Sequence, residues 1–378
     1  MSELLVNTIK KADGTGSLSV PAESGTVVTT ASPSLGRRNL IINGAMQVAQ
    51  RGTSFTGITN SEGWGADRFR LPVGASSGTY TVSQESDGPD GYAKSFKALV
   101  TATGSTGGSN YALFRYKFEG QDLQHLKYGT SGAEQITVSF WFKSNKTGTY
   151  QVTLRNLNSN RMVGATYNVS SADTWEQKII TFPADTTGSF TNDNGDSLRM
   201  DWWLHSGATF NSGSVPTVWA TYNSANQAAG QTVNLADTIN NYAQITGVQL
   251  EVGSVATPFE HRSYGEELAA CQRYFQKTVN GFFGIADTSS SVIFCHGFPV
   301  TMRAKPTISL YDGTNVRVGD MISYGNNTSS GNVASNFGTQ YTASFRVTGF
   351  SGLTTFRTYL SEIDGGVYED PYGFDAEL

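Results

Sequence analysis

Side chains that could carry out catalysis are few in this sequence and form no recognised catalytic motif. There is no His-Glu-x-x-His metal-binding motif and no phosphate-binding Gly-x-x-x-x-Gly-Lys loop. The two cysteines, Cys271 and Cys295, are too few for a disulfide framework or for a four-ligand zinc site. The four histidines are scattered along the chain: His125, His205, His261 and His296. We therefore expect a protein that is not an enzyme and has no cofactor.

One pair of carboxylates is close in sequence. Asp193 and Asp196 lie in the segment Asn-Asp-Asn-Gly-Asp-Ser, residues 192–197, whose composition is typical of a tight turn. A solvated turn is the favoured interpretation. A calcium site is the alternative, because oxygen ligands at alternate positions suit that ion. A catalytic acid pair for glycoside cleavage is a third possibility. We predict no metal, with Asp193 and Asp196 as the weak calcium candidates.

The tryptophans are more informative than the charged residues. Strand alternation places Trp141 and Trp203 on faces opposite to aliphatic residues. Such a tryptophan is covered by a second layer of the same protein, by a neighbouring subunit or by a ligand. Sugar rings stack their apolar C–H faces on indoles, and polar neighbours meet the hydroxyls. Lys143 and His205 share these faces, so a glycan-binding surface would use Trp141, Lys143, Trp203 and His205. Burial of these tryptophans in the core or between subunits is the favoured interpretation, and glycan contact is the alternative.

Composition indicates a β-rich protein. The chain has 378 residues, of which 12% are aromatic, only 15% are charged and 42 are glycines. Few charges with many aromatics argue against disorder, and Gly with Asn supplies the tight turns between strands. The formal net charge is −5, and no dense Lys/Arg stripe is present, so we expect no nucleic-acid partner. The sequence has no run of 18 apolar residues, so we expect no membrane insertion. Its first residues lack the apolar core of a signal peptide.

The alternating segments predict an all-β fold. Residues 38–262 carry runs in which apolar residues point one way and polar residues the other, as in antiparallel sheets stacked face to face. No amphipathic helices alternate with them, which disfavours a parallel α/β fold. We predict a jelly-roll β-sandwich. The expected strands are Leu40–Asn43, Thr79–Ser83, Ser95–Val100, Tyr111–Phe118, Ile136–Lys143, Tyr150–Arg155, Glu176–Phe182, Leu198–His205 and Ile245–Val252.

Three further regions flank the sandwich. Residues 1–37 hold short β-prone pieces, Ser17–Val20 and Thr26–Thr30, and form either a flexible leader or a segment that orders by pairing with another chain. Residues 263–279 are expected to form a linker helix of about 15 residues, which begins with a capping box of Ser263 and Glu266. Residues 280–378 are expected to form a small C-terminal β domain.

Within the C-terminal domain, the sequence predicts a polar loop at Gly325–Asn332 and an exposed acidic tail at Glu369–Leu378. The expected strands are Val292–His296, Thr307–Tyr311, Asn315–Val318, Ala343–Thr348 and Leu353–Leu360.

Several segments resemble bacteriophage tail fibre and virion appendage proteins. The opening segment, Asn39–Met46 (Asn-Leu-Ile-Ile-Asn-Gly-Ala-Met), with Arg51-Gly and Trp64–Phe69, is similar to the start of a domain common in those proteins. The leader around Lys10–Ser17 looks like the start of fibres that plug into the tail. Further matching segments are Ile245–Gly253, Ala256–Glu260, Ser263–Phe275 and Phe298–Thr307.

A second, looser resemblance is to jelly-roll carbohydrate-binding modules. They open with Asn-Leu-x-x-Asn-Gly, as residues 39–44 do, and close with a strand like Gly247–Val252. Many of them place a calcium-binding Glu soon after the opening motif. Here Ala45, Met46 and Gln47 stand there instead, so the resemblance does not imply that calcium site.

The resemblances imply a virion protein assembled in the host cytoplasm. It would be a homotrimeric, non-enzymatic tail fibre adhesin that attaches to a tail or nozzle protein through residues 1–37 and binds a host surface polysaccharide. A purely structural virion protein, such as a fibre base, adaptor or capsid decoration, is the alternative. A glycan depolymerase is a third candidate, although the long repeat of a β-helix is not seen.

Overall fold

The computed structural model divides the chain into two compact units, Met1–Arg38 and Asn39–Leu378. In the first unit, β1 (Ile9–Lys10) pairs antiparallel with β2 (Ser17–Leu18). The predicted strand at Thr26–Thr30 lies outside the described residues. The described residues are 9–10, 17–18, 37–105, 107–277, 282–310, 316–320, 326–329, 332–363 and 372–378.

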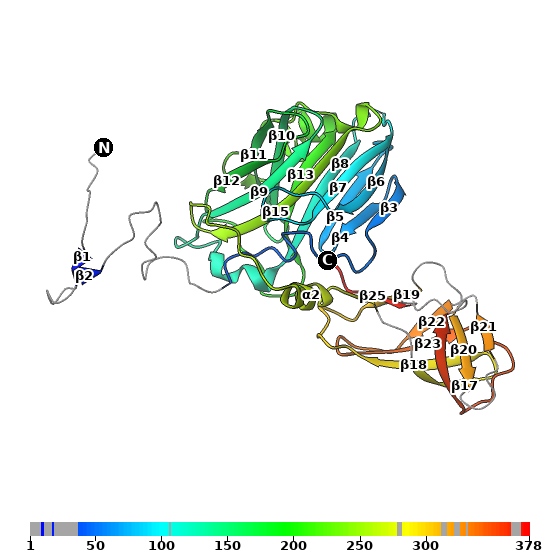
Figure 1. The fold of residues 1–378 in the computed structure, drawn as a ribbon. Helices are drawn as coiled ribbons and strands as arrows, with labels where there is room; N and C mark the ends of the chain where they lie inside the picture. Colours follow the sequence, from blue (N-terminus) through cyan, green and yellow to red (C-terminus); the bar gives the residue numbers. More distant parts are fainter. Residues whose placement is uncertain are drawn as a thin grey trace. The chain divides into compact units, whose positions relative to one another are not determined.

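Two antiparallel sheets form the larger part of the second unit (Figure 1). The seven-stranded sheet has the order β14 (Ala220–Thr221), β11 (Arg161–Val169), β10 (Gly148–Asn156), β13 (Asp196–Ser206), β8 (Tyr111–Glu119), β5 (Phe69–Gly74) and β4 (Glu62–Ala66). The six-stranded sheet has the order β12 (Glu176–Phe182), β9 (Ile136–Ser144), β15 (Tyr242–Val252), β7 (Ser95–Ala102), β6 (Thr79–Glu85) and β3 (Ser54–Ile58).

The core lies between these sheets, as alternation predicts. Phe140 of β9 and Trp202 of β13 are both fully buried, and their rings meet edge to face with centroids 5.8 Å apart. The apolar residues on the inward-facing sides of both sheets form one cluster. The all-β prediction is confirmed, and the fold is of the jelly-roll kind. Burying this cluster removes apolar surface from water, which is the main term that stabilises such a sandwich.

The predicted strand Leu40–Asn43 is wrong: these residues belong to no strand and lead into a turn that begins at Asn43, which is in the left-handed region at φ 61°. The buried Asn43 side chain donates to the carbonyls of Val48 (2.8 Å) and Asp67 (2.9 Å) and accepts from the Val48 amide (2.9 Å). A Cβ on Gly44 would lie 2.1 Å from the Val248 carbonyl oxygen, so this turn also sits directly against β15. The opening segment is therefore a structural connection.

Replacing Asn43 by alanine is expected to lower the free energy of unfolding by at least about 3 kcal/mol, because buried partners left without a hydrogen bond cost roughly 1–3 kcal/mol each. Asn60 offers a matched control, since it also has a positive φ (47°) but is exposed and accepts one bond, from the Ser76 amide. Asn60→Ala should cost about 1 kcal/mol. Urea unfolding of both variants checks the difference, and equal losses would contradict it.

The short elements include one helix of note. Helix α2 (Tyr264–Gln272) begins with the predicted capping box: Ser263 Oγ accepts from the Glu266 amide, and the Glu266 carboxylate accepts from the Ser263 amide. The predicted extension to residue 279 is wrong, because Phe275 begins strand β16 (Phe275–Lys277). The remaining short helices are η1 (Gly120–Leu126), α1 (Ala208–Asn211), η2 (Ser224–Asn226) and η3 (Leu235–Asp237).

The C-terminal region is also antiparallel β. One sheet of three strands has the order β16, β25 (Tyr372–Asp375) and β19 (Thr307–Leu310). The other has seven strands in the order β21 (Asn326–Ser329), β20 (Val316–Asp320), β24 (Thr358–Ile363), β17 (Phe283–Thr288), β18 (Ser291–Gly297), β23 (Thr342–Thr348) and β22 (Asn332–Asn336). A separate apolar cluster, which includes Phe294, Phe345 and Phe374, forms its core.

Two expectations for this region are corrected. The predicted polar loop at Gly325–Asn332 contains strand β21 and the start of β22. The predicted exposed tail is largely buried where the structure describes it: Tyr372 and Phe374 have no exposed surface and Ala376 is 5% exposed, while the Asp375 side chain is 39% exposed.

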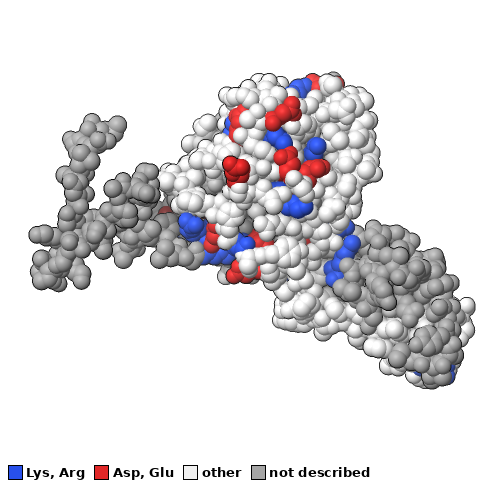
Figure 2. Space-filling model, viewed as in Figure 1, with Lys and Arg blue, Asp and Glu red and all other residues white. Residues whose placement is uncertain are grey.

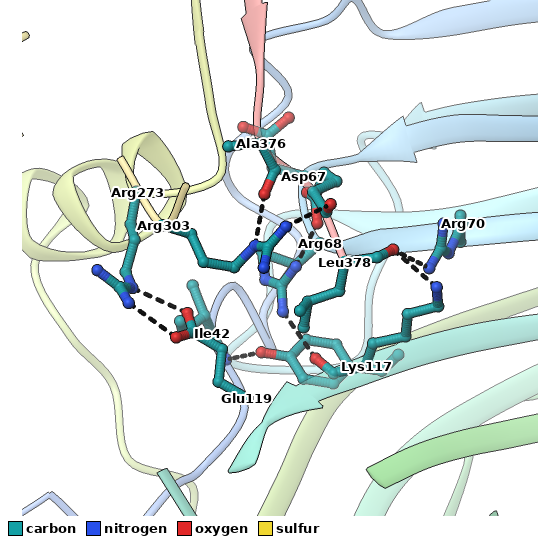
Figure 3. Close-up of polar contacts among 12 residues, drawn as sticks. Ile42, Asp67, Arg68, Arg70, Lys117, Glu119, Arg273, Arg303, Ala376 and Leu378 are labelled. Atoms are coloured by element: carbon teal, nitrogen blue, oxygen red, sulfur yellow. Dashed lines mark hydrogen bonds and ion pairs between the residues drawn. The ribbon is translucent and has the colours of Figure 1, made fainter. Parts of the chain in front are cut away.

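The last residues of the chain join the sandwich through a buried ionic junction (Figure 3). The Arg68 guanidinium pairs with Glu377, donates to the Lys117 carbonyl (2.7 Å) and lies 3.5 Å from the Tyr274 ring centroid. The Leu378 carbonyl accepts from Arg70 (2.8 Å) and from Lys117 (2.7 Å). We call Arg51, Arg68, Arg70, Lys117 and Glu377 the ionic junction.

Helix α2 and the segment after β18 also bond to residues beside the ionic junction. Arg273 makes two bonds to the buried carboxylate of Glu119, at 2.8 and 2.7 Å. Arg303 donates to the carbonyls of Ala376 (2.7 Å) and Glu377 (3.1 Å). Four of the segments that carry the tail fibre resemblance, those of Arg51, Arg68, Arg273 and Arg303, thus contact this region and help to hold the sandwich, α2 and β25 together.

Candidate functional site

The predicted glycan-contact residues separate into a buried pair, Trp203 and His205, and a partly buried pair, Trp141 and Lys143. Trp203 of β13 is 1% exposed and His205 is 2% exposed. The Trp203 ring packs on Phe210 of α1, with centroids 5.3 Å apart, and lies in one cluster with Leu113 and Ala228. The expectation that Trp203 and His205 form an accessible surface is therefore corrected. A second layer of the same chain, around α1, covers them.

Burial also sets the chemistry of these side chains. Desolvation lowers the pKa of His205 below its ordinary value. Arg115, beside them on β8, makes two bonds to Asp201, at 2.7 and 2.8 Å. This outer face of β13 is thus occupied by internal contacts.

Trp141 and Lys143 lie on the outer face of the six-stranded sheet. Trp141 of β9 stands in register between Gln177 of β12 and Thr246 of β15, and its side chain is half-buried. The Lys143 ammonium pairs with Asp87 and lies 5.0 Å from the centroid of the Trp175 ring. Trp141 therefore keeps part of its surface accessible, whereas the Lys143 side chain is only 11% exposed and is held by Asp87 in the loop that precedes β7.

Trp175, which strand alternation alone does not place, joins this surface from just before β12. Its indole Nε1 donates to Asp87 at 3.4 Å, and the Gln244 amide donates to the same carboxylate at 3.3 Å. Burial raises the pKa of Asp87, but hydrogen bonds from Lys143 and Trp175 outweigh it, so the pKa lies below its ordinary value. Asp87 is thus a stable anion that fixes Lys143 and Trp175.

A further aromatic group lies beside Trp141. Tyr92 contacts Phe259 (centroids 5.2 Å apart) and His261 (5.6 Å). Gly247, at φ 60°, lies beneath both Tyr92 and Trp141, because a Cβ there would fall 2.8 Å and 3.0 Å from their ring atoms. The glycine lets the rings approach the strand closely. We call Tyr92, Trp141, Trp175, Phe259 and His261 the aromatic face.

Buried polar groups form the floor of the aromatic face. Thr246 Oγ1 donates to the Lys94 carbonyl at 2.7 Å, and Gln244 Nε2 donates to Ser95 at 3.1 Å. Gln249 accepts from the Glu260 amide at 2.8 Å, which fixes the segment that carries Phe259 and His261. Because these hydrogen bonds hold the polar groups in place, the backbone segments that carry the aromatic side chains are fixed as well.

The other chemical candidates do not assemble into sites. Asp196 pairs with Lys117 (3.0 Å) and Arg199 (2.7 Å), and Asp193 accepts from the Gly195 amide (2.9 Å), as in a turn. Among the described residues, no group of three or more His, Cys, Asp or Glu could hold a metal. Residues 74–78 have Gly-x-Ser-x-Gly spacing, but Ser76 lies in a turn between strands β5 and β6, where a nucleophile elbow would lead into a helix.

A hollow of about 380 Å³ lies elsewhere on the sandwich. It is bordered by Tyr128 and Phe190, whose rings stack with centroids 5.2 Å apart. Its polar rim includes Gln124, Lys127 and Thr130. This volume is at the lower end of small-ligand sites.

The described residues contain no helix of the length and apolarity that crossing a membrane requires. On the face drawn in Figure 2, acidic and basic side chains lie next to one another and most of the surface is uncharged.

No protein-family model matches the sequence, and no curated protein matches it. Among solved structures, the enzymatically active domain of tailspike protein 4 from bacteriophage CBA120 is 13% identical, with a TM-score of 0.31 over 57% of this chain and 21% of that chain. The family 11 carbohydrate-binding module of Clostridium thermocellum is 12% identical (TM-score 0.27, 55% and 99% covered).

A C-terminal family 22 carbohydrate-binding module from the same organism is 10% identical (TM-score 0.26, 55% and 99% covered). The chain spans about a fifth of the tailspike chain it matches.

Proposed function

We propose that the chain is a non-enzymatic tail fibre adhesin of a bacteriophage virion, which binds a host surface glycan through the aromatic face. The observation that carries the glycan part is the pair of accessible indoles, Trp141 and Trp175, fixed beside Lys143 and Asp87 on one sheet face. The tail fibre part rests on the sequence resemblance. In this proposal residues 1–37 attach the protein to the tail, and copies of the chain assemble as a trimer.

The aromatic face has the parts that sugar recognition needs. An indole offers a flat apolar surface for the C–H face of a pyranose, and charged or amide groups beside it meet the hydroxyls. Lys143 is a donor and Asp87 an acceptor, and each already holds the other in place. Because these side chains are ordered before the glycan arrives, less conformational entropy is lost on binding.

The same arrangement supports adhesion over cleavage. A general acid for glycoside hydrolysis needs a raised pKa, and the pKa of Asp87 is lowered by Lys143 and Trp175 despite the opposing effect of burial. A single weak site is sufficient for an adhesin, because several copies on one fibre raise the effective affinity roughly 10²–10⁴-fold.

The test is a combined binding and cleavage assay. The labelled full-length protein is incubated with a panel of purified bacterial capsular polysaccharides and lipopolysaccharide O-chains, and bound protein and polymer length are read from the same samples. We expect binding to at least one polymer, with its chain length unchanged. Shortened polymer would make the protein a depolymerase. Failure to bind any polymer, or the cells that carry them, would favour a structural virion role.

A further inference from the structure

The basic side chains beside the aromatic face are already engaged by other groups of this chain. The strand register places Lys97 of β7, Gln244 of β15 and Lys143 of β9 in one cross-strand row. The Lys143 side chain is only 11% exposed, and its ammonium pairs with Asp87. The Lys97 ammonium lies 4.9 Å from the centroid of the Tyr242 ring. Both ammonium groups thus have a partner within the fold.

The carboxylates of the same surface are more accessible than these ammonium groups. The Asp87 side chain is 47% exposed. Asp173, in the turn before Trp175, is exposed and accepts a hydrogen bond from the Tyr242 hydroxyl. Burial raises the pKa of Tyr242, and the bond to Asp173 with the charges of Asp173 and Asp87 raises it further, so both carboxylates act on this surface. A ligand that approaches the indoles therefore meets accessible carboxylates.

We propose that the aromatic face binds uncharged sugar residues and excludes acidic ones, such as uronates, sialates and sugar phosphates. This inference rests on the proposed function and names the class of its ligand. A sugar carboxylate that leaves water needs a cation beside it, because an unpaired charge costs far more to desolvate than a hydroxyl. Lys143 could serve it only by leaving Asp87, and Asp87 would then lie unpaired beside a second negative charge.

A neutral sugar meets no such penalty. Its C–H face stacks on Trp141 or Trp175, and its hydroxyls donate to the accessible Asp87 carboxylate while the ion pair with Lys143 stays intact. Selection against acidic sugars thus comes from a repulsive group that penalises the wrong ligand.

The first test uses pairs of polymers that differ in charge. Each capsular polysaccharide or O-chain that the wild type binds is converted to its counterpart: a neutral polymer is oxidised at its primary hydroxyls to uronates, and an acidic polymer is carboxyl-reduced. We expect the neutral member of each pair to bind the full-length protein at least tenfold more tightly. A smaller preference, or a preference for the acidic member, would overturn the inference and leave the adhesin proposal standing. Failure to bind any polymer would overturn both.

The salt dependence shows whether charge is the cause, because oxidation also removes a hydroxyl. The affinities of each pair are measured at about 0.1 M and about 1 M salt, between which the Debye length falls from about 10 Å to about 3 Å. Repulsion predicts a preference that shrinks at high salt. A preference that does not change with salt would come from the lost hydroxyl and would contradict the inference.

A variant then tests the carboxylate itself. Asp87→Asn should lower the ratio of neutral to acidic affinity at least threefold, because it removes the negative charge and frees Lys143. A general weakening of the site would not change this ratio. Glu134→Gln is the matched control, since Glu134 also pairs with a lysine and its side chain is 40% exposed. It should keep the wild-type ratio, and equal ratios in the two variants would overturn the inference.

Discussion

Replacing Glu377 by glutamine is expected to lower the free energy of unfolding by about 3–5 kcal/mol, the usual cost of leaving a buried charge without its partner. Glu377 and Arg68 are both buried, with side chains 7% and 2% exposed, and they pair directly. Arg51 also approaches the Glu377 carboxylate, at 3.6 Å. The neutral amide leaves both guanidinium groups buried with less compensation.

The expected pH dependence follows from the pKa of Glu377. Burial raises this pKa, but Arg68, Arg51 and Arg70 outweigh burial and hold it below the ordinary 4.5. A carboxyl with a lower pKa in the folded state stabilises the fold fully above its unfolded pKa, and this contribution is lost as pH falls through the folded value. The stability difference between the wild type and Glu377→Gln should therefore be largest near neutral pH and should shrink below pH 4.5.

Asp67, in the same region, has a pKa raised by burial and also by the charge of Glu377, so Glu377→Gln removes part of that upward shift as well. Glu134→Gln is the control, because Glu134 pairs with Lys127 at the surface (side chains 40% and 58% exposed). It should change stability by less than about 1 kcal/mol. Urea unfolding followed by tryptophan fluorescence gives these values, and equal effects of both substitutions would refute the role of the ionic junction.

The sheets could be predicted from the sequence because alternation is a local signal. In β9, Phe140 and Phe142 face the core while Trp141 faces outward, as period two requires. The strand Arg161–Val169 was missed, since Gly164 interrupts its pattern; its Cβ position is taken by the Gln151 amide, 2.9 Å away. The polar strand Asn326–Ser329 was also missed, because its pairing with β20 is fixed by backbone bonds that composition does not reveal.

The candidate site could be predicted only in part. Alternation along β13 correctly predicts that Trp203 lies on the face opposite to the core. The residue that covers Trp203 is Phe210, which lies in a segment without a periodic pattern. Trp175 was missed because its contact with Asp87 spans 88 residues. Long-range contacts of this kind leave no local trace in one sequence.

The ionic junction also changes what the tail fibre resemblance means. The matching residues Asn43, Arg68 and Arg273 are all engaged in internal hydrogen bonds and ion pairs. They maintain the fold, so a shared motif here is explained by stability. The two tryptophans proposed to contact a glycan, Trp141 and Trp175, lie outside those motifs, whereas Phe259 of the aromatic face lies within one of them.

Replacing Trp141 by alanine is expected to weaken glycan binding about 30-fold, since truncating a central aromatic contact typically costs 2 kcal/mol or more. Trp175→Ala should have a similar effect, and Trp175→Phe a smaller one, because phenylalanine keeps a ring but loses the Nε1 bond to Asp87. Affinity is measured by calorimetry with a soluble oligosaccharide from the polymer that the wild type binds, so that multivalency does not mask the loss. Unfolding curves confirm that each variant is folded.

The same titration decides between the two places where a sugar could bind. Phe190→Ala removes the ring that stacks on Tyr128 in the hollow that these two residues border, and it leaves the aromatic face unchanged. If the aromatic face is the site, Phe190→Ala keeps wild-type affinity while Trp141→Ala loses it. The reverse pattern would move the site to the hollow and reject the aromatic face. Asp87→Asn should weaken binding without removing a ring, because Lys143, Trp175 and Gln244 all rely on its carboxylate for their positions.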